Sequence, residues 1–184
     1  ALKLQSLALA KSGADIIAPT DMMDGRIGAI REFLEENNFP DITIISYAAK
    51  FASSFYSPFR DAVGSSSNLG KSDKKTYQMD YRNSSESVRE VELDISEGAD
   101  IIMIKPAMIY SDIIKDISSR FDIPVFAYQV SGEYSMIKCG AEKNLFDYES
   151  AIIETLTSIK RAGATAIFTY AAIDVAKILK NRGE

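Results

Sequence analysis

Short apolar runs alternate with longer amphipathic stretches along the chain. In three places a helical stretch ends at a glycine, and a β-branched run follows it directly. Glycine is the usual residue where a helix ends in the left-handed conformation. A short, uninterrupted apolar run is typical of a parallel strand that is buried on both faces. The three segments are 11–19, 96–106 and 161–170.

Two further strands fit the same plan, at 42–46 and 124–128. Strands that alternate with helices indicate βα units around a parallel sheet. Five strands fit either a doubly wound sheet or part of a (β/α)8 barrel, and a whole barrel takes about 250 residues. A chain of 184 residues, one domain by length, would hold only part of such a barrel. The predicted helices are 24–38, 83–97, 110–119, 147–161 and 173–181.

A long polar stretch, 60–80, separates a predicted strand from the next predicted helix. It contains Gly64, three consecutive serines, Gly70 and a short group of lysines. Loops of this length inside compact domains are usually lids over a site or disordered segments. We expect a lid here.

The charge and the apolar pattern exclude several classes of partner. The net charge is −5, and the one basic cluster, Lys71, Lys74 and Lys75, is short. Nucleic acids and anionic membranes bind larger basic patches, so we expect neither. No apolar run approaches the roughly 18 residues that span a bilayer, and no signal-peptide pattern opens the chain. The single cysteine, Cys139, excludes an internal disulfide framework, so we expect a cytoplasmic protein.

The chain has no histidine. Ser-His-Asp hydrolysis, imidazole acid–base catalysis and histidine zinc sites are therefore excluded within this segment. With one cysteine, the segment also cannot form a cysteine-rich zinc site by itself. The remaining reactive side chains point toward amine catalysis by lysine.

Two lysines follow the ends of predicted strands, where parallel α/β folds place their sites. Lys105 ends the apolar run 101–104 and precedes Pro106, and Lys50 follows the strand that we expect to end at Ser46. Burial and a second nearby ammonium both lower the pKa of a lysine. A neutral amine attacks ketones and forms a Schiff base. The alternative is that each lysine extends its ammonium to solvent from the rim of the sheet.

Other polar residues near the strand ends have both a functional and a structural interpretation. Arg60 and Lys74 flank the expected lid and would clamp a carboxylate, or they are solvated loop charges. Tyr128, Ser131 and Tyr170 offer hydroxyl groups to a second carboxylate, although core packing explains two of them equally well.

Acidic residues near two helices are also open to two interpretations. Asp21 and Asp24 would orient an amine or accept protons, or Asp24 simply stabilises a helix N-terminus. Glu90 shares a helix face with Glu86 and Asp94, and a charged, exposed face explains that pattern without a site.

Four motifs stand out, at 18–26, 46–60, 103–106 and 128–134. They resemble those of one known family, delta-aminolevulinic acid dehydratase. They are long, and they follow in the same order over nearly the whole chain. The resemblance implies a (β/α)8 TIM barrel, of which this chain would hold roughly the last five strands. Residues 1–184 would then be a partial catalytic domain, without the N-terminal strands and an oligomerising arm, and inactive by itself.

The resemblance also implies roles for individual residues. Lys50 matches the lysine that holds the first substrate as a Schiff base, and Lys105 matches the lysine that holds the second. Asp21 matches an acidic residue near the first substrate's amino group. Arg60 and Lys74 match the groups that bind its carboxylate. Ser131 and Tyr170 match the groups that bind the second substrate's carboxylate. Tyr128 and Phe59 match residues that line the pocket.

The implied activity is that of a lyase in heme biosynthesis, which condenses two 5-aminolevulinate molecules into porphobilinogen with loss of water. Members of the family are homo-oligomers, and an octamer is expected. Glu90 matches a ligand of an allosteric Mg²⁺. Whether the active site uses Zn²⁺ or Mg²⁺ depends on a segment outside this sequence. Two departures are Thr20 where most members have serine, and Lys74 where many have arginine.

Two other functions remain open. A class I aldolase also uses a lysine at a strand end, but it needs only one and usually a phosphate site. A degenerate relative would act as an interaction module. The presence of Lys50, Lys105 and Arg60 together favours the first interpretation over both alternatives.

Overall fold

The five predicted strands are present, and they form one parallel sheet in the order of the sequence. The structure is a computed structural model that describes residues 1–64 and 74–183. Each strand pairs with the strand that follows it in the chain. The strands in the described residues are β1 (Ile16–Ile17), β2 (Thr43–Lys50), β3 (Ile101–Lys105), β4 (Val125–Tyr128) and β5 (Ala166–Phe168).

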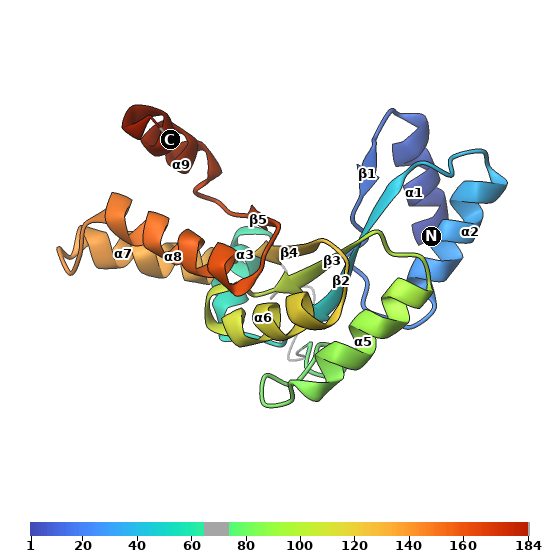
Figure 1. The fold of residues 1–184 in the computed structure, drawn as a ribbon, viewed down its shortest axis with the longest axis horizontal. Coiled ribbons are helices and arrows are strands. Elements are labelled where there is room, and N and C mark those ends of the chain that lie inside the picture. The colour runs from blue at the N-terminus through green and yellow to red at the C-terminus, as the bar shows by residue number, and fades with distance from the viewer. Residues whose placement is uncertain (65–73, 184) are drawn as a thin grey trace.

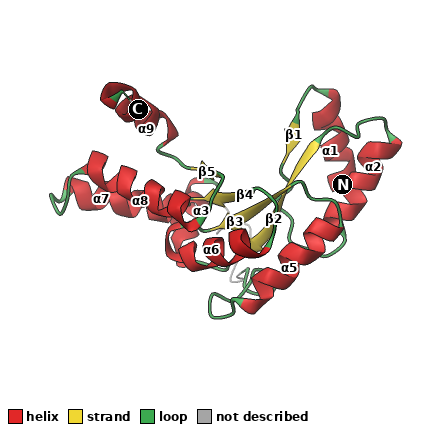
Figure 2. Ribbon diagram, in the orientation of Figure 1, coloured by secondary structure: helices red, strands yellow, loops and turns green. Residues whose placement is uncertain are grey.

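Helices connect the strands and lie outside the sheet (Figure 2). The five predicted helices correspond to α2, α5, α6, α8 and α9, and α1 ends just before Gly13 as the repeated pattern predicts. The longer helices are α1 (Leu2–Lys11), α2 (Arg26–Glu36), α5 (Ser85–Ser96), α6 (Ser111–Arg120), α7 (Ser131–Glu142), α8 (Tyr148–Ala162) and α9 (Ala172–Arg182). Shorter ones are η1 (Ser54–Tyr56), α3 (Ser57–Ala62) and η2 (Met108–Tyr110).

The sheet is curled, and the ribbon forms an open arc (Figure 1). β1 and β5 are its two edge strands. Helix α9 stands away from the sheet beyond β5, and α1 and α2 lie together at the opposite end. Parallel strands in sequential order with helices outside are the arrangement of a (β/α)8 barrel, and five such strands cannot close the ring.

The two faces of the sheet carry separate apolar clusters. On the outer face, Ile44, Ile102 and Ile104 are fully buried against the helices. Burial of each such side chain stabilises the fold by about 1.5–3 kcal/mol. The inner, concave face carries a smaller cluster, to which Phe126 and Tyr128 are added at the edge. Its buried members are Ile45, Tyr47, Ile101 and Met103.

Three glycines end helices in the left-handed region, as predicted. The φ angles of Gly13, Gly98 and Gly163 are 91°, 96° and 122°. A side chain at Gly163 would also meet Ser118, whose Oγ would lie 2.1 Å from the added Cβ. After two of these turns the strand packs against the helix that precedes it, β1 against α1 and β5 against α8, whereas α5 packs mainly against β2.

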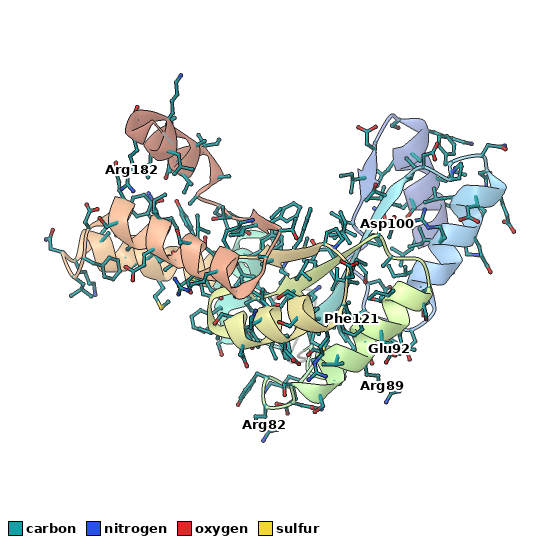
Figure 3. All side chains as sticks on the ribbon, viewed as in Figure 1. Arg82, Arg89, Glu92, Asp100, Phe121 and Arg182 are labelled. Atoms are coloured by element: carbon teal, nitrogen blue, oxygen red, sulfur yellow. The ribbon has the colours of Figure 1, made fainter. Side chains whose placement is uncertain are left out.

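An ion pair joins α2 to the start of β2 and β3. Asp100 pairs with Arg31 and accepts a hydrogen bond of 2.8 Å from the Ile44 backbone N–H. Arg31 also donates to the carbonyl oxygens of Gly98 and Ile42. Figure 3 shows Asp100 at the junction between the strands and the pair formed by α1 and α2. These contacts align the first residues of the two strands that carry the lysines.

The end of β2 differs from the prediction, and part of the expected lid lies outside the described residues. β2 does not end at Ser46 but continues to Lys50. Of the expected lid over 60–80, the structure describes 60–64, which include the end of α3, and 74–80. Residues 65–73 lie outside the described residues.

Candidate active site

Lys50 and Lys105 are direct neighbours across the sheet. They are the last residues of β2 and β3, and the register pairs one with the other. Neighbouring strands lie about 4.8 Å apart, so the two side chains begin side by side. The backbone is fixed around them, because the Phe51 N–H donates to the Lys105 carbonyl at 2.9 Å and the Met79 N–H donates to the Lys50 carbonyl at 3.1 Å.

A bulge in β2 brings Lys50 to the inner face. Side chains alternate along a regular strand, and Tyr47 lies on the inner face, so residue 50 would point outward. The register shifts between Ser46 and Ala49, and both Ala48 and Ala49 belong to the outer core. Bulges re-aim side chains in this way and are frequent beside active sites. Lys50 therefore points to the same side as Lys105.

Both lysines have lowered pKa values. The pKa of Lys105 is lowered from 10.5 to about 8, first by burial and then by the charges of Lys50 and Lys74. Burial also lowers the pKa of Lys50, and Lys74 adds to the effect, whereas Asp21 opposes it. A lysine with a pKa near 8 is partly neutral at physiological pH and is therefore a nucleophile.

A cavity of about 130 Å³ joins the two lysines to the residues of the expected carboxylate clamp. Arg60 comes from α3, and Lys74 lies where the described chain resumes. Gln78 also faces this cavity; it is buried, and its Oε1 has no hydrogen-bond partner among the described residues. The lining consists of Lys50, Tyr56, Phe59, Arg60, Val63, Lys74, Gln78 and Lys105.

A second, smaller cavity of about 30 Å³ also reaches Lys105. Tyr56, Phe59 and Lys105 line both cavities, so the two cavities adjoin at these residues. The Lys105 Nζ atom lies 3.9 Å from the centre of the Tyr128 ring. The predicted second-site residues come together here, and the lining consists of Tyr56, Phe59, Lys105, Tyr128, Val130, Ser131 and Tyr170.

The start of α7 holds the second cavity together. The Ser131 Oγ accepts a hydrogen bond of 3.1 Å from the Phe59 backbone N–H, which ties α7 to α3. This approach needs Gly132, because a Cβ at that position would lie 2.4 Å from the backbone oxygen of Phe55. Tyr170 stacks on Tyr134 of the same helix, with ring centres 5.9 Å apart.

Glu133 joins the loops that follow β3 and β4. Its fully buried carboxylate accepts backbone hydrogen bonds from Met108 at 2.7 Å, Val130 at 2.9 Å and Ala107 at 3.3 Å. The Ile109 N–H also donates to it. One side chain thus fixes the segment after Lys105 relative to the segment that carries Ser131.

We expect Glu133→Gln to destabilise the protein by about 2–4 kcal/mol. The amide NH₂ of glutamine would face backbone N–H groups whose hydrogen bonds the carboxylate now accepts. Urea-induced unfolding at a fixed protein concentration measures this loss. Glu142→Gln is the matched control, because Glu142 is exposed on the same helix. A Glu133→Gln variant as stable as Glu142→Gln would contradict this role.

The acidic residues divide into two groups. Asp21 lies near Lys50 and influences its pKa, and its Oδ1 accepts a hydrogen bond of 2.8 Å from the Met23 N–H. Glu90 lies on α5 and lines a separate cavity with Asp24 and Glu86, away from both lysines. Burial raises the pKa of Glu90, and Asp24 raises it further.

Sequence reasoning missed several residues of this site. Tyr47, Tyr56, Gln78, Gly132 and Glu133 received no role of their own. Gly132 and Glu133 stand directly after Ser131, but only a helix beginning at that serine gives them a function. Gln78 carries no pattern that distinguishes it from an ordinary loop glutamine.

The model of the family "Delta-aminolevulinic acid dehydratase" matches residues 1–178. The chain is 52% identical over 179 residues to the delta-aminolevulinic acid dehydratase of Bradyrhizobium diazoefficiens, covering 97% of this chain and 50% of that protein. It is 57% identical over 170 residues to the Methanothermus sociabilis enzyme of the same name, covering 92% and 52%. The chain belongs to the delta-aminolevulinic acid dehydratase family. It spans about half the length of these relatives.

A solved structure of this family has the same fold. The Toxoplasma gondii delta-aminolevulinic acid dehydratase (porphobilinogen synthase), in complex with the reaction product porphobilinogen, matches with a TM-score of 0.95 and 48% identity. The match covers 98% of this chain and 51% of that one. The prediction that the chain forms part of a TIM barrel is confirmed. Among the described helices, none has the length and apolar character needed to cross a membrane.

Proposed function

We propose that the protein containing this chain is a porphobilinogen synthase, a lyase of heme biosynthesis that condenses two 5-aminolevulinate molecules into porphobilinogen with loss of two molecules of water. The observation that carries the proposal is the pairing of Lys50 and Lys105 on one face of the sheet, with lowered pKa values. The Toxoplasma gondii relative was solved with that product bound.

Each substrate ketone would be captured by one lysine. The neutral amine attacks the carbonyl carbon and an N–C bond forms. The carbonyl oxygen leaves as water, carrying one amine proton and one proton taken up from solvent, so that a protonated imine remains. Lys50 would hold the first substrate and Lys105 the second, one in each of the two adjoining cavities. Holding both reactants in place can contribute about 7–11 kcal/mol at best.

The polar residues of the two cavities would bind the substrate carboxylates. Arg60 and Lys74 would take that of the first substrate, since both line the larger cavity. Ser131 and Tyr170 would take that of the second, between the rings of Tyr128 and Phe59. Asp21, which is close enough to Lys50 to influence its pKa, would face the first substrate's amino group.

Borohydride trapping with 5-aminolevulinate on the complete protein tests this function. Borohydride reduces an imine to a stable secondary amine, which mass spectrometry locates. Adducts on both Lys50 and Lys105 are expected. An adduct on only one lysine would indicate aldolase-like chemistry, and no adduct on either would indicate an interaction module.

The rate of imine formation at Lys105 should rise with pH and level off above about pH 8, because only the neutral amine attacks and the pKa is lowered to about 8. Lys50→Met removes a neighbouring positive charge, so the pKa of Lys105 should rise and its profile should move to higher pH. At pH 7 we expect trapping at Lys105 to be several-fold slower in this variant. Lys115→Met, an exposed lysine on α6, is the control; a profile unchanged by Lys50→Met would refute the coupling.

We propose Glu90 as a ligand of a regulatory Mg²⁺. Carboxylate oxygens are the donors that Mg²⁺ prefers, and it usually keeps several water ligands. Glu90, Asp24 and Glu86 line one cavity of about 590 Å³, so donors of the right kind are present. In the described part of the chain, no three histidine, cysteine or acidic side chains gather closely enough to hold a metal alone. Water would therefore complete the shell.

Three further expectations remain proposals for the complete protein: a homo-octamer, a cytoplasmic location, and an active-site metal that is either Zn²⁺ or Mg²⁺. Exposed apolar side chains support association. Ile173 on α9 is 72% exposed, as is Leu145 between α7 and α8. Cys139 is exposed on α7, and it does not line either lysine cavity.

A further inference from the structure

One aromatic ring lies against both lysines. The Nζ atoms of Lys50 and Lys105 are each 5.4 Å from the centre of the Tyr47 ring. This is within the distance of about 6 Å at which a cation is attracted to the face of an aromatic ring. Tyr47 is buried on the inner face of the sheet, only 7% exposed. Other rings contact Lys105 as well, but among the contacts of the described residues Tyr47 alone is shared by both amines.

The bulge in β2 makes this arrangement possible. Tyr47 and Lys50 are three residues apart, so they would face opposite sides of a regular strand. The shift at Ala48 and Ala49 places both on the inner face. Lys105 is the register partner of Lys50, and its side chain reaches the same ring from the neighbouring strand.

We propose that Tyr47 is a positioning residue shared by the two substrate sites, whose ring holds both lysine nitrogens in place and stabilises them when they carry positive charge. Each lysine nitrogen carries a positive charge at two stages: as the ammonium before the reaction, and as the protonated imine after water has left. The attraction of the ring favours both forms at either site. It offsets part of the repulsion between two cations that are held side by side.

We assign the effect to the ring of Tyr47, which lies against both nitrogens. Burial, followed by the influence of Tyr128, raises the pKa of its phenol to about 12. The phenol therefore stays neutral at physiological pH and adds no negative charge to the attraction. The predicted consequence is that phenylalanine can replace Tyr47, whereas an aliphatic residue cannot.

Several other charged or titratable groups act on the two amines and must be kept constant in any test. Lys74 lowers the pKa of both lysines, and Asp21 raises that of Lys50. Tyr56 and Tyr128 present their rings to Lys105 alone. Arg60 lines the same cavity. None of these residues is altered in the variants below.

Competitive acetylation over a range of pH, with peptides quantified by mass spectrometry, reports the titration of each lysine without substrate. In Tyr47→Leu we expect the midpoints of both Lys50 and Lys105 to move to lower pH, because the ring no longer stabilises the ammonium. At pH 7 both should be labelled about 2- to 10-fold faster. Tyr47→Phe should match the wild type. Phe126→Leu, on the same inner face, controls for the loss of an aromatic side chain.

Pentafluorophenylalanine at position 47 keeps the ring and nearly its volume, but its fluorine atoms remove the negative electrostatic potential of the ring face. This substitution should move both midpoints to lower pH, as Tyr47→Leu does. It provides the test if the leucine variant does not fold. A shift at only one lysine, or at neither, would refute the shared role. A change in the plateau rate at high pH without a change in midpoint would indicate altered access, and would also refute it.

The catalytic consequence rests on the proposed function. In the porphobilinogen assay on the complete protein, Tyr47→Leu should lower kcat about tenfold or more, and Tyr47→Phe should stay within about twofold of wild type. Because acetylation is measured without substrate, the two proposals fail separately. Shifted midpoints with no borohydride adducts would refute only the synthase, whereas adducts on both lysines with unshifted midpoints would refute only the role of Tyr47.

Discussion

Replacing Lys105 by methionine should reduce kcat for porphobilinogen formation by about 10⁴-fold or more. Methionine is similar in length and has no amine, so the second substrate loses its covalent attachment while the cavity keeps its shape. The magnitude follows from proximity, since holding a reactant in place is worth an effective concentration of about 10⁵–10⁸ M. Steady-state kinetics of the complete protein measure the loss directly.

The Lys105→Met variant should still form the Schiff base at Lys50. Lys50 keeps its backbone position, because the hydrogen bond from Met79 to its carbonyl does not involve Lys105. Borohydride should therefore still trap 5-aminolevulinate on Lys50 of the variant. Lys115→Met controls for removal of a positive charge, since that lysine is exposed on α6. Full activity of Lys105→Met would remove the basis for a double Schiff base.

The pattern of the sequence predicts the strands and both lysines, but not the geometry that joins them. Each strand is an apolar run after a helix-ending glycine, and such runs are local in sequence. The position of Lys105 followed from its strand alone, because residues 101, 103 and 105 share one face. The face to which Lys50 points could not be predicted in this way. Simple alternation from Tyr47 would have placed it on the outer face, and only the bulge, which depends on pairing with β3, reverses that result.

The resemblance to the family assigned candidate roles to the predicted site residues, whereas physical reasoning from one sequence left each of them open to a structural interpretation. Arg60 and Ser131 are ordinary in pattern, and 72 residues separate Ser131 from the backbone group of Phe59 that it binds. Helix α7 was not predicted because its first turn contains Ser131 and Gly132, which have low helix propensity. Tertiary contacts of Glu133 override that preference, and such contacts are not visible in a local pattern.

Gly132→Ala should both destabilise the protein and disrupt the site. The added Cβ would lie 2.4 Å from the backbone oxygen of Phe55 and 2.7 Å from its Cα. Backbone atoms cannot turn aside as a side chain can, so η1 and α3 must move away from α7. Overpacking of this kind costs about 1–3 kcal/mol. The movement would also stretch the hydrogen bond between Phe59 and Ser131.

Because Phe59 lines both cavities and Arg60 follows it directly, the displacement should affect both substrates. A misplacement of about 1 Å can cost roughly 100-fold in rate, so we expect kcat/KM to fall by at least about that factor. Thermal unfolding and steady-state kinetics measure the two effects. Gly28→Ala is the matched control: its Cβ would meet Glu97 at an ordinary 3.5 Å within α2, and alanine is the better helix former by about 1 kcal/mol. If both variants remain stable and active, the close approach of η1 to α7 does not define the site.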